Sequence, residues 1–142
     1  MANQAIDEID LKILQALLNN ALLTNKEIGE TVHLTGQAVG ARVRKLQDLG
    51  VIEGYTLQWN PERIGLHVHA FLIVFMNANH THQAFLEFVR STEAVTEVHR
   101  VGGEGCYWLR IRTSTIAALN KLLEDVLRFG NYKLSISIEK VK

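Results

Sequence analysis

The chain has 142 residues, of which 47% are hydrophobic and 21% are charged, and its formal net charge is zero. No run of residues approaches the roughly 20 apolar residues that a membrane span needs, and the N-terminus lacks the basic and apolar regions of a signal peptide. The one cysteine, Cys106, excludes a disulfide within the chain and agrees with a reducing compartment. We therefore expect a cytoplasmic globular protein without membrane contact, small enough for oligomerisation to add stability.

Two helical patterns open the chain. Apolar residues at helical spacing predict an amphipathic helix over residues 7–19, and acidic residues in its first turn suit the helix dipole. Thr24 and Glu27 then have the spacing of a capping box, which predicts a second, short helix through about Val32. The chain therefore begins with two helices joined by a short connection.

A third helix is predicted after a tight turn at His33–Leu34. Thr35 has the side chain of a helix N-cap, and the helix should run over residues 36–49, with Gly50 just beyond its end. Its apolar stripe consists of Val39, Val43 and Leu46. Three helices with a tight turn between the last two form the helix-turn-helix layout of DNA-binding proteins.

The electrostatic case for DNA depends on this third helix. The first 60 residues hold more acidic than basic side chains, so only a local basic stripe, expected on the exposed face opposite the apolar stripe, favours nucleic acid. Polar residues at the helix start should meet base edges, and basic ones should meet phosphates or guanines. The predicted DNA contacts are Thr35, Gln37, Ala38, Arg42, Arg44 and Lys45. The alternative is a plain three-helix core with a solvated basic face.

After the third helix the periodicity changes. Apolar and polar residues alternate over Tyr55–Trp59, which predicts a strand, and Pro61 breaks it and starts a helical turn. We expect a helix-turn-helix domain over residues 1–51, a linker strand and turn over residues 52–65, and a second domain over residues 66–142.

The second domain alternates between strand and helix patterns. Strands are expected at residues 67–76, 95–101, 106–112 and 132–141, with helices at residues 82–90 and 116–127. This βαββαβ order is that of the ferredoxin-like fold. Such a sheet has one helix-covered face and one bare face, so we expect a second subunit to cover the bare face.

Other residues could in principle bind a metal, catalyse a reaction or hold a ligand, but they have simpler interpretations. The six histidines do not supply three or four convergent metal ligands with carboxylates nearby, so no metal site is expected. Cys106 has no base at a readable spacing, and no catalytic residue is expected. Gly102–Gly105 lie between two strands, which excludes a phosphate-binding loop before a helix. If their face of the strand is an interface, Arg110 and Arg112 need protein partners or water there, and the alternative is contact with an anionic effector.

Several features together resemble one known family. The chain carries Ile9-Asp10-x-x-Ile13-Leu14-x-x-Leu17, a continuous match from Leu34 to Tyr55, Ile64-Gly65-Leu66, and a βαββαβ tail with a glycine-rich turn. In these features it resembles the Lrp/AsnC (leucine-responsive, asparagine-operon, or feast-or-famine) transcriptional regulators over essentially its whole length. The resemblance implies an α+β fold, with an N-terminal winged-helix-like helix-turn-helix domain and a C-terminal ferredoxin-like βαββαβ (RAM-type) domain.

The resemblance also implies a function. Family members are DNA-binding regulators rather than enzymes; they dimerise through the C-terminal domain, often assemble into octamers, and bend or wrap DNA. Many bind an amino acid near the turn between the second and third strands of the tail. Here that turn consists of Gly102, Gly103, Glu104, Gly105 and Cys106. The partners implied are double-stranded DNA, further copies of the chain and an amino-acid effector, with no cofactor and a nucleoid-associated location in the cytoplasm.

Two departures from the family keep alternatives open. Cys106 stands where an acid is common, which leaves Glu104 as the one carboxylate of the turn. The third helix contains Gly36, Gly40 and Ala41, small residues that offer few groups for base readout and favour recognition of DNA shape. One alternative is therefore an effector-independent, nucleoid-associated architectural protein. The other is an enzyme similar to the tetrapyrrole decarboxylases of the same layout, against which the basic third helix argues.

Overall fold

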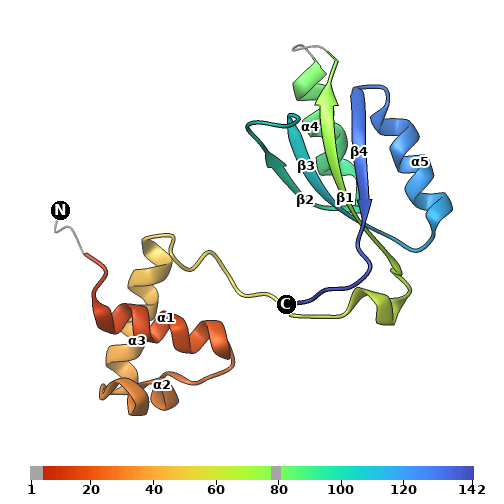
Figure 1. Ribbon diagram of the computed structural model, residues 1–142. Helices are drawn as coiled ribbons and strands as arrows, with labels where there is room; N and C mark the ends of the chain where they lie inside the picture. Colours follow the sequence, from red (N-terminus) through yellow and green to blue (C-terminus); the bar gives the residue numbers. More distant parts are fainter. Residues whose placement is uncertain (1–4, 78–80) are drawn as a thin grey trace. The chain divides into compact units, whose positions relative to one another are not determined.

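The computed structural model describes residues 5–77 and 81–142, which form two compact units. The first unit ends at Gln58, and its described regular elements are all helices. The second begins at Trp59 and is built on a sheet covered by helices (Figure 1). In the described part of the chain, every helix is too short or too polar to cross a bilayer. The α+β class expected from the sequence is confirmed.

The first unit contains the three predicted helices, α1 (Glu8–Asn19), α2 (Asn25–Val32) and α3 (Gly36–Asp48). Each begins with a side chain that accepts a hydrogen bond from the first turn: Asp7, Thr24 and Thr35. At α1 and α2 an acidic residue three positions on also bonds the cap's own backbone N–H, which completes a capping box. Local chemistry therefore sets all three helix starts.

The core of this unit consists of one or two apolar residues from each helix. Ile13, Ile28 and Val39 are fully buried and pack together. Burial of each such side chain stabilises the unit by about 1.5–3 kcal/mol. A three-helix unit of this size therefore depends on a small number of contacts.

The turn between α2 and α3 is tight because a glycine faces it. His33 adopts a left-handed conformation with φ of 59°, and the Leu34 N–H donates to the Gly29 carbonyl at 3.0 Å. A Cβ on Gly29 would lie 2.3 Å from the Leu34 carbonyl oxygen, so only glycine fits against the turn. This close approach fixes the angle at which α3 leaves α2.

The predicted linker strand is wrong. Residues 53–60 are without regular secondary structure, and the side chains of Tyr55, Leu57 and Trp59 are more than half exposed. Alternation alone does not make a strand, because a strand needs a neighbour for its backbone hydrogen bonds, and no described strand pairs with this segment. The helical turn expected after it is present as η1 (Pro61–Ile64).

The second unit has the predicted βαββαβ order. Its elements are β1 (Val68–Met76), α4 (His82–Ser91), β2 (Val95–Arg100), β3 (Tyr107–Thr113), α5 (Ile116–Val126) and β4 (Gly130–Ile136). The strands form one antiparallel sheet in the order β2-β3-β1-β4. Both helices pack on one face of the sheet, whose core residues include the fully buried Ala70, Leu72, Val74, Leu109 and Ile111.

The last strand is shorter than its sequence pattern suggests. It begins at Gly130, paired with Met76, and its ladder ends where Ser137 donates to the His69 carbonyl. Beyond that point β1 has almost no backbone left to pair, since β1 begins at Val68. Ile138 is consequently exposed, although it continues the apolar alternation of the strand.

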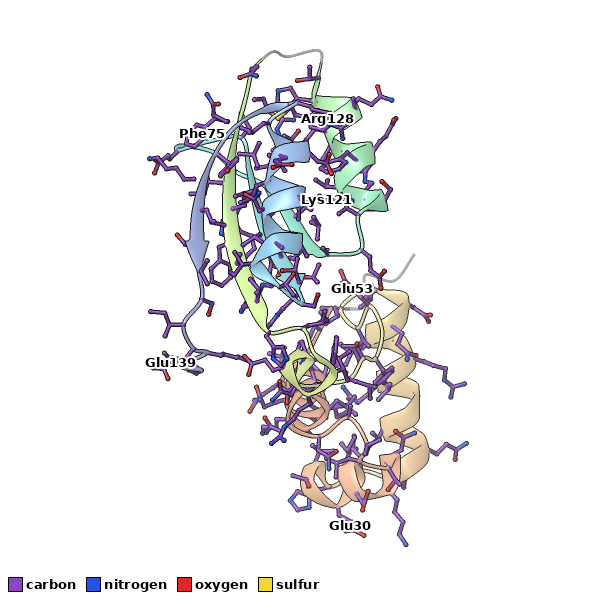
Figure 2. The ribbon with its side chains drawn as sticks, turned by 90° about the vertical axis from the view of Figure 1, so that its right-hand side faces the viewer. Glu30, Glu53, Phe75, Lys121, Arg128 and Glu139 are labelled. Carbon is purple, nitrogen blue, oxygen red and sulfur yellow. The ribbon has the colours of Figure 1, made fainter. Side chains whose placement is uncertain are left out.

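The other face of the sheet carries apolar side chains that no helix of this unit covers. Phe71, Ile73 and Phe75 of β1 and Trp108 of β3 lie on this face, and each is only partly buried. The rings of Phe71 and Trp108 stack with centroids 5.5 Å apart. Figure 2 shows Phe75 on the side of the sheet away from Lys121 of α5. The bare face expected from the fold is therefore present and rich in aromatic residues.

We predict that G29A destabilises the first unit. The added methyl group overlaps a backbone oxygen that cannot move independently, which should lower the free energy of unfolding by roughly 1–3 kcal/mol. G54A is the matched control, because a Cβ at Gly54 meets nothing within 4 Å. Thermal unfolding of both variants, followed by circular dichroism, measures the difference; equal melting curves would contradict the packing described here.

Candidate nucleic-acid interface

Two basic residues of α3 are bound to two acidic residues at the start of α1. The Arg42 Nη1 atom lies 2.7 Å from an Asp7 carboxylate oxygen and 2.9 Å from an Asp10 oxygen, and Lys45 Nζ donates to the other Asp10 oxygen. Asp10 is completely buried, whereas the side chains of Arg42 and Lys45 are 27% and 18% exposed. We call these four residues the Asp10 cluster.

The two carboxylates of the Asp10 cluster are ionised at neutral pH. The hydrogen bond from Arg42, aided by the Asp10 backbone N–H, lowers the pKa of Asp7 to about 2. Burial alone would raise the pKa of Asp10, but its hydrogen bonds with the Asp7 backbone, Lys45 and Arg42 outweigh burial, and its pKa is lowered. With two carboxylates and two cations, the cluster presents no net charge.

The structure therefore corrects the expectation that Arg42 and Lys45 lie free on the face opposite the apolar stripe. Both side chains turn toward the N-terminal end of α1, because unpaired burial of Asp10 would be costly. Their role in the fold is to hold α3 against α1. The sequence contains the signal for this pairing, in the two acids of the α1 capping box, but nothing in it gives the distance between helices.

The exposed face of α3 is formed by other residues. Gln37, Ala41, Arg44 and Asp48 are exposed and recur at the spacing of one helical face. No described side chain forms an ion pair with Arg44, so its guanidinium is free to meet a phosphate or a base.

Two other predicted contact residues stand at the start of α3. The Thr35 hydroxyl accepts the Ala38 N–H at 3.1 Å, so it caps the helix while the residue itself stays exposed. Ala38 is half-buried.

The glycines of α3 face α2 rather than solvent. A Cβ on Gly36 would lie 3.3 Å from the Lys26 backbone nitrogen, and one on Gly40 would lie 3.0 Å from the Asn25 side-chain nitrogen. Gly36 and Gly40 therefore make room for another helix, which gives their small size a structural reason within the unit. Lys26, which sequence reasoning missed, is exposed in the first turn of α2, beside the start of α3.

The turn singled out as an effector site connects β2 to β3. Gly102, Gly103 and Glu104 are exposed, while Gly105 and Cys106 are half-buried. The Glu104 carboxylate accepts a hydrogen bond from Lys133 Nζ of β4. Cys106 is anchored by its backbone, whose N–H donates to the Val74 carbonyl at 2.8 Å.

The two arginines on the bare sheet face, Arg110 and Arg112, differ in whether they have an ion-pair partner. The Arg110 Nε atom lies 3.2 Å from a Glu97 carboxylate oxygen, which confirms the prediction that Arg110 has a protein partner. Its guanidinium also lies 5.7 Å from the ring centres of Phe71 and Trp108. Arg112 has no ion-pair partner in the part of the chain that the structure describes.

The described residues hold no group of three side chains suited to a metal ion.

Comparisons with known proteins agree on one family. The model of the AsnC-type helix-turn-helix domain matches residues 6–47, and that of the Lrp/AsnC ligand binding domain matches residues 69–142. The chain belongs to the Lrp/AsnC family. It is 44% identical to the HTH-type transcriptional regulator LrpB of Bacillus subtilis, covering 96% of this chain and 91% of that protein. It is 32% identical to the leucine-responsive regulatory protein of Escherichia coli, covering 86% and 76%.

A solved structure has the same fold along nearly the whole chain. A transcriptional regulator of Neisseria meningitidis in complex with L-methionine matches with a TM-score of 0.90 at 28% identity, over 97% of this chain and 93% of that one. Together with the helix-turn-helix unit, these relatives identify the Lrp/AsnC protein described here as a DNA-binding transcriptional regulator. The interpretation as a decarboxylase-like enzyme is not supported, because the relatives are named regulators.

We predict that the first unit loses stability in acid through the Asp10 cluster. Because the folded-state pKa of Asp7 lies below its ordinary value of 3.8, the ionised carboxylate stabilises the fold above about pH 4. That contribution disappears as the pH falls toward 2. Helical circular dichroism between pH 5 and pH 2 should show this decline, and D7N should be less stable at pH 5 with a flatter decline. D48N is the control, and parallel curves for D7N and the unmodified protein would refute the prediction.

Proposed function

We propose that this regulator reads DNA with the exposed face and the N-terminal turn of α3. The contact residues proposed are Thr35, Gln37, Ala38 and Arg44, with Lys26 added from α2. Gln37 near the helix start has an amide suited to base edges, and Arg44 and Lys26 supply charge for phosphates. The observation that carries this proposal is that Arg44 is the exposed cation of α3, whereas Arg42 and Lys45 are bound to Asp10.

The small number of free cations determines how the protein must bind. Each additional phosphate contact contributes to affinity and steepens the salt dependence by about 0.9 in the log–log slope. Two cations for each helix-turn-helix unit give a weak electrostatic attraction. Strong binding therefore requires several units on one DNA molecule, which an oligomer supplies.

We infer that a second copy of the chain covers the bare sheet face. Its aromatic centre, Phe71 and Trp108, is only partly buried in the single chain, and apolar patches of this kind mark interaction surfaces. The His69 Nε2 atom is also buried on this face without a hydrogen-bond partner among the described residues, so the surface is incomplete by itself. A dimer, and larger assemblies built from it, would present helix-turn-helix units to successive grooves and bend or wrap the duplex.

We also propose that an amino acid modulates the regulator at the turn Gly102–Cys106. The relatives include a protein named leucine-responsive and a structure named as an L-methionine complex, and both support this class of effector. Action on the chromosome would place the protein in the cytoplasm in association with the nucleoid.

One observation favours a second candidate, an architectural DNA-binding protein without an effector. Cys106 cannot hold an ammonium group by charge, and Glu104 is already bound to Lys133. The two candidates differ in their response to amino acids and in their sequence selectivity.

We predict that R44A weakens DNA binding, whereas R42A weakens the fold. R44A should lower affinity for all sequences and flatten the salt slope of a dimer by about 2, because two phosphate contacts are lost. R42A should instead reduce the free energy of unfolding by roughly 1–3 kcal/mol, because Asp10 loses a partner, while the salt slope of the folded protein stays the same. Gel shifts over a salt series and thermal unfolding measure both effects.

The control for these variants is K12A, since Lys12 lies on α1 and pairs with Glu8. If R44A matched K12A in affinity and slope, while R42A flattened the slope, the DNA surface would include the Asp10 cluster rather than the face proposed here.

We further predict that L-leucine or L-methionine changes the assembly or the DNA affinity of the regulator. Light scattering and gel shifts with a promoter fragment and with shuffled DNA, each with and without the amino acid, test this. A response to either amino acid supports an effector-modulated regulator. No response to the apolar amino acids, with comparable affinity for both DNA fragments, identifies the architectural candidate.

A further inference from the structure

The start of α1 does not require the negative charge of Asp7. Asp7 is the N-cap of this helix, and its carboxylate accepts the Asp10 N–H at 2.8 Å. Asparagine and serine cap helices as well as aspartate does, so the cap needs an acceptor oxygen rather than a charge. Glu8 and Asp10 already supply the negative charge that favours a helix start. The charge of Asp7 therefore acts mainly on a group outside α1.

The group on which Asp7 acts is the guanidinium of Arg42. The Arg42 Nη1 atom lies 2.8 Å and 2.7 Å from the two Asp7 carboxylate oxygens. The buried Asp10 does not depend on this contact, because it has both Arg42, at 2.9 Å, and Lys45 as partners. Asp10, Arg42 and Lys45 together carry one net positive charge. Asp7 reduces the net charge of the Asp10 cluster from one to zero.

The ion pair of Asp7 and Arg42 lies at the surface of the first unit. The side chains of Asp7 and Arg42 are 50% and 27% exposed. Arg42 and Lys45 stand on either side of Arg44 in the sequence of α3, so these two cations border the exposed face of the helix. A recognition helix lies in the major groove with phosphates on both sides of it. A net charge on this flank of α3 therefore changes the attraction of the unit to the DNA backbone.

We propose that Asp7 limits the affinity of this regulator for DNA by neutralising Arg42 beside the exposed face of α3. This inference rests on the proposed function of that face, and it adds a residue of α1 that opposes binding without touching DNA. With an uncharged residue at position 7, Arg42 stays bonded to Asp10, and the unit gains a third cation beside Arg44 and Lys26. The gain concerns phosphates, which every DNA sequence presents alike.

The consequence is that DNA binding depends on self-association. A unit that attracts DNA weakly holds a duplex only when several units bind the same molecule. With Arg42 neutralised, each helix-turn-helix unit stays weak, and affinity rises with the number of units in the oligomer. A more strongly charged unit would bind in smaller assemblies, and a change of assembly would then have less effect on the DNA.

The test measures how D7N and D7S bind a fluorescent duplex of random sequence, by anisotropy over a salt series at neutral pH. Both variants of the full chain keep a capping oxygen and lose the charge. They should bind more tightly at low salt and steepen the log–log salt slope of a dimer by about 2, because each unit gains one phosphate contact. Their advantage over the unmodified protein should then fall about tenfold between 50 mM and 200 mM salt. Helical circular dichroism shows that each variant is folded.

E8Q is the matched control, because Glu8 is the next residue of the chain and pairs with Lys12 of α1. It changes the net charge of the chain by the same amount as D7N, and it should leave the salt slope as it is in the unmodified protein. The double variant D7N/R42Q removes the cation that D7N exposes. Its slope should therefore return to that of the unmodified protein.

Two results would overturn the inference and leave the proposed DNA contacts intact. In the first, folded D7N and D7S have the salt slope of E8Q while R44A flattens it, so the charge of Asp7 has no effect on DNA. In the second, D7N/R42Q keeps the steeper slope of D7N, so the added attraction does not come from Arg42. If R44A itself leaves the slope unchanged, the exposed face of α3 does not read DNA, and the inference fails with the proposed function.

Discussion

A buried carboxylate joins α1 to α3, and the geometry of the DNA-binding unit depends on it. Asp10 is fully buried and is satisfied by its capping bond to α1, by Arg42 and by Lys45. A buried charge that loses its partners is costly, so α3 cannot slide or rotate along α1 without a penalty. The polar connection thereby supplies an orientation that the small apolar core, built on Ile13, Ile28 and Val39, would specify less sharply.

The same cluster determines which side chains of α3 remain for DNA. Because Arg42 and Lys45 are neutralised within the unit, the exposed face offers Arg44 and polar groups such as Gln37. A unit with so little free charge is poorly suited to act alone. The second unit carries a bare aromatic sheet face that is suited to self-association. An oligomer formed through that face would bring several weakly binding helix-turn-helix units to one DNA molecule.

The bare face also adjoins the turn between β2 and β3, which we propose as the effector site. Gly105 lets the turn fold onto β1, and Glu104 reaches Lys133 at the edge of the surface that we propose a second subunit covers. A small molecule bound there would touch the turn, β4 and the covering subunit at once. Such a position allows the differential contacts between assembly states that regulation by a ligand requires.

The sequence by itself determined the elements whose causes are local. Helix caps at Asp7, Thr24 and Thr35, the apolar periodicity and the βαββαβ order each depend on residues within a few positions of one another. The tertiary structure alone decided that Arg42 turns toward Asp10, that Glu104 meets Lys133, and that the alternating segment Tyr55–Trp59 has no strand to pair with. Those outcomes depend on groups about 30 residues apart, or on the absence of a neighbouring strand, and periodicity carries no information about such distances.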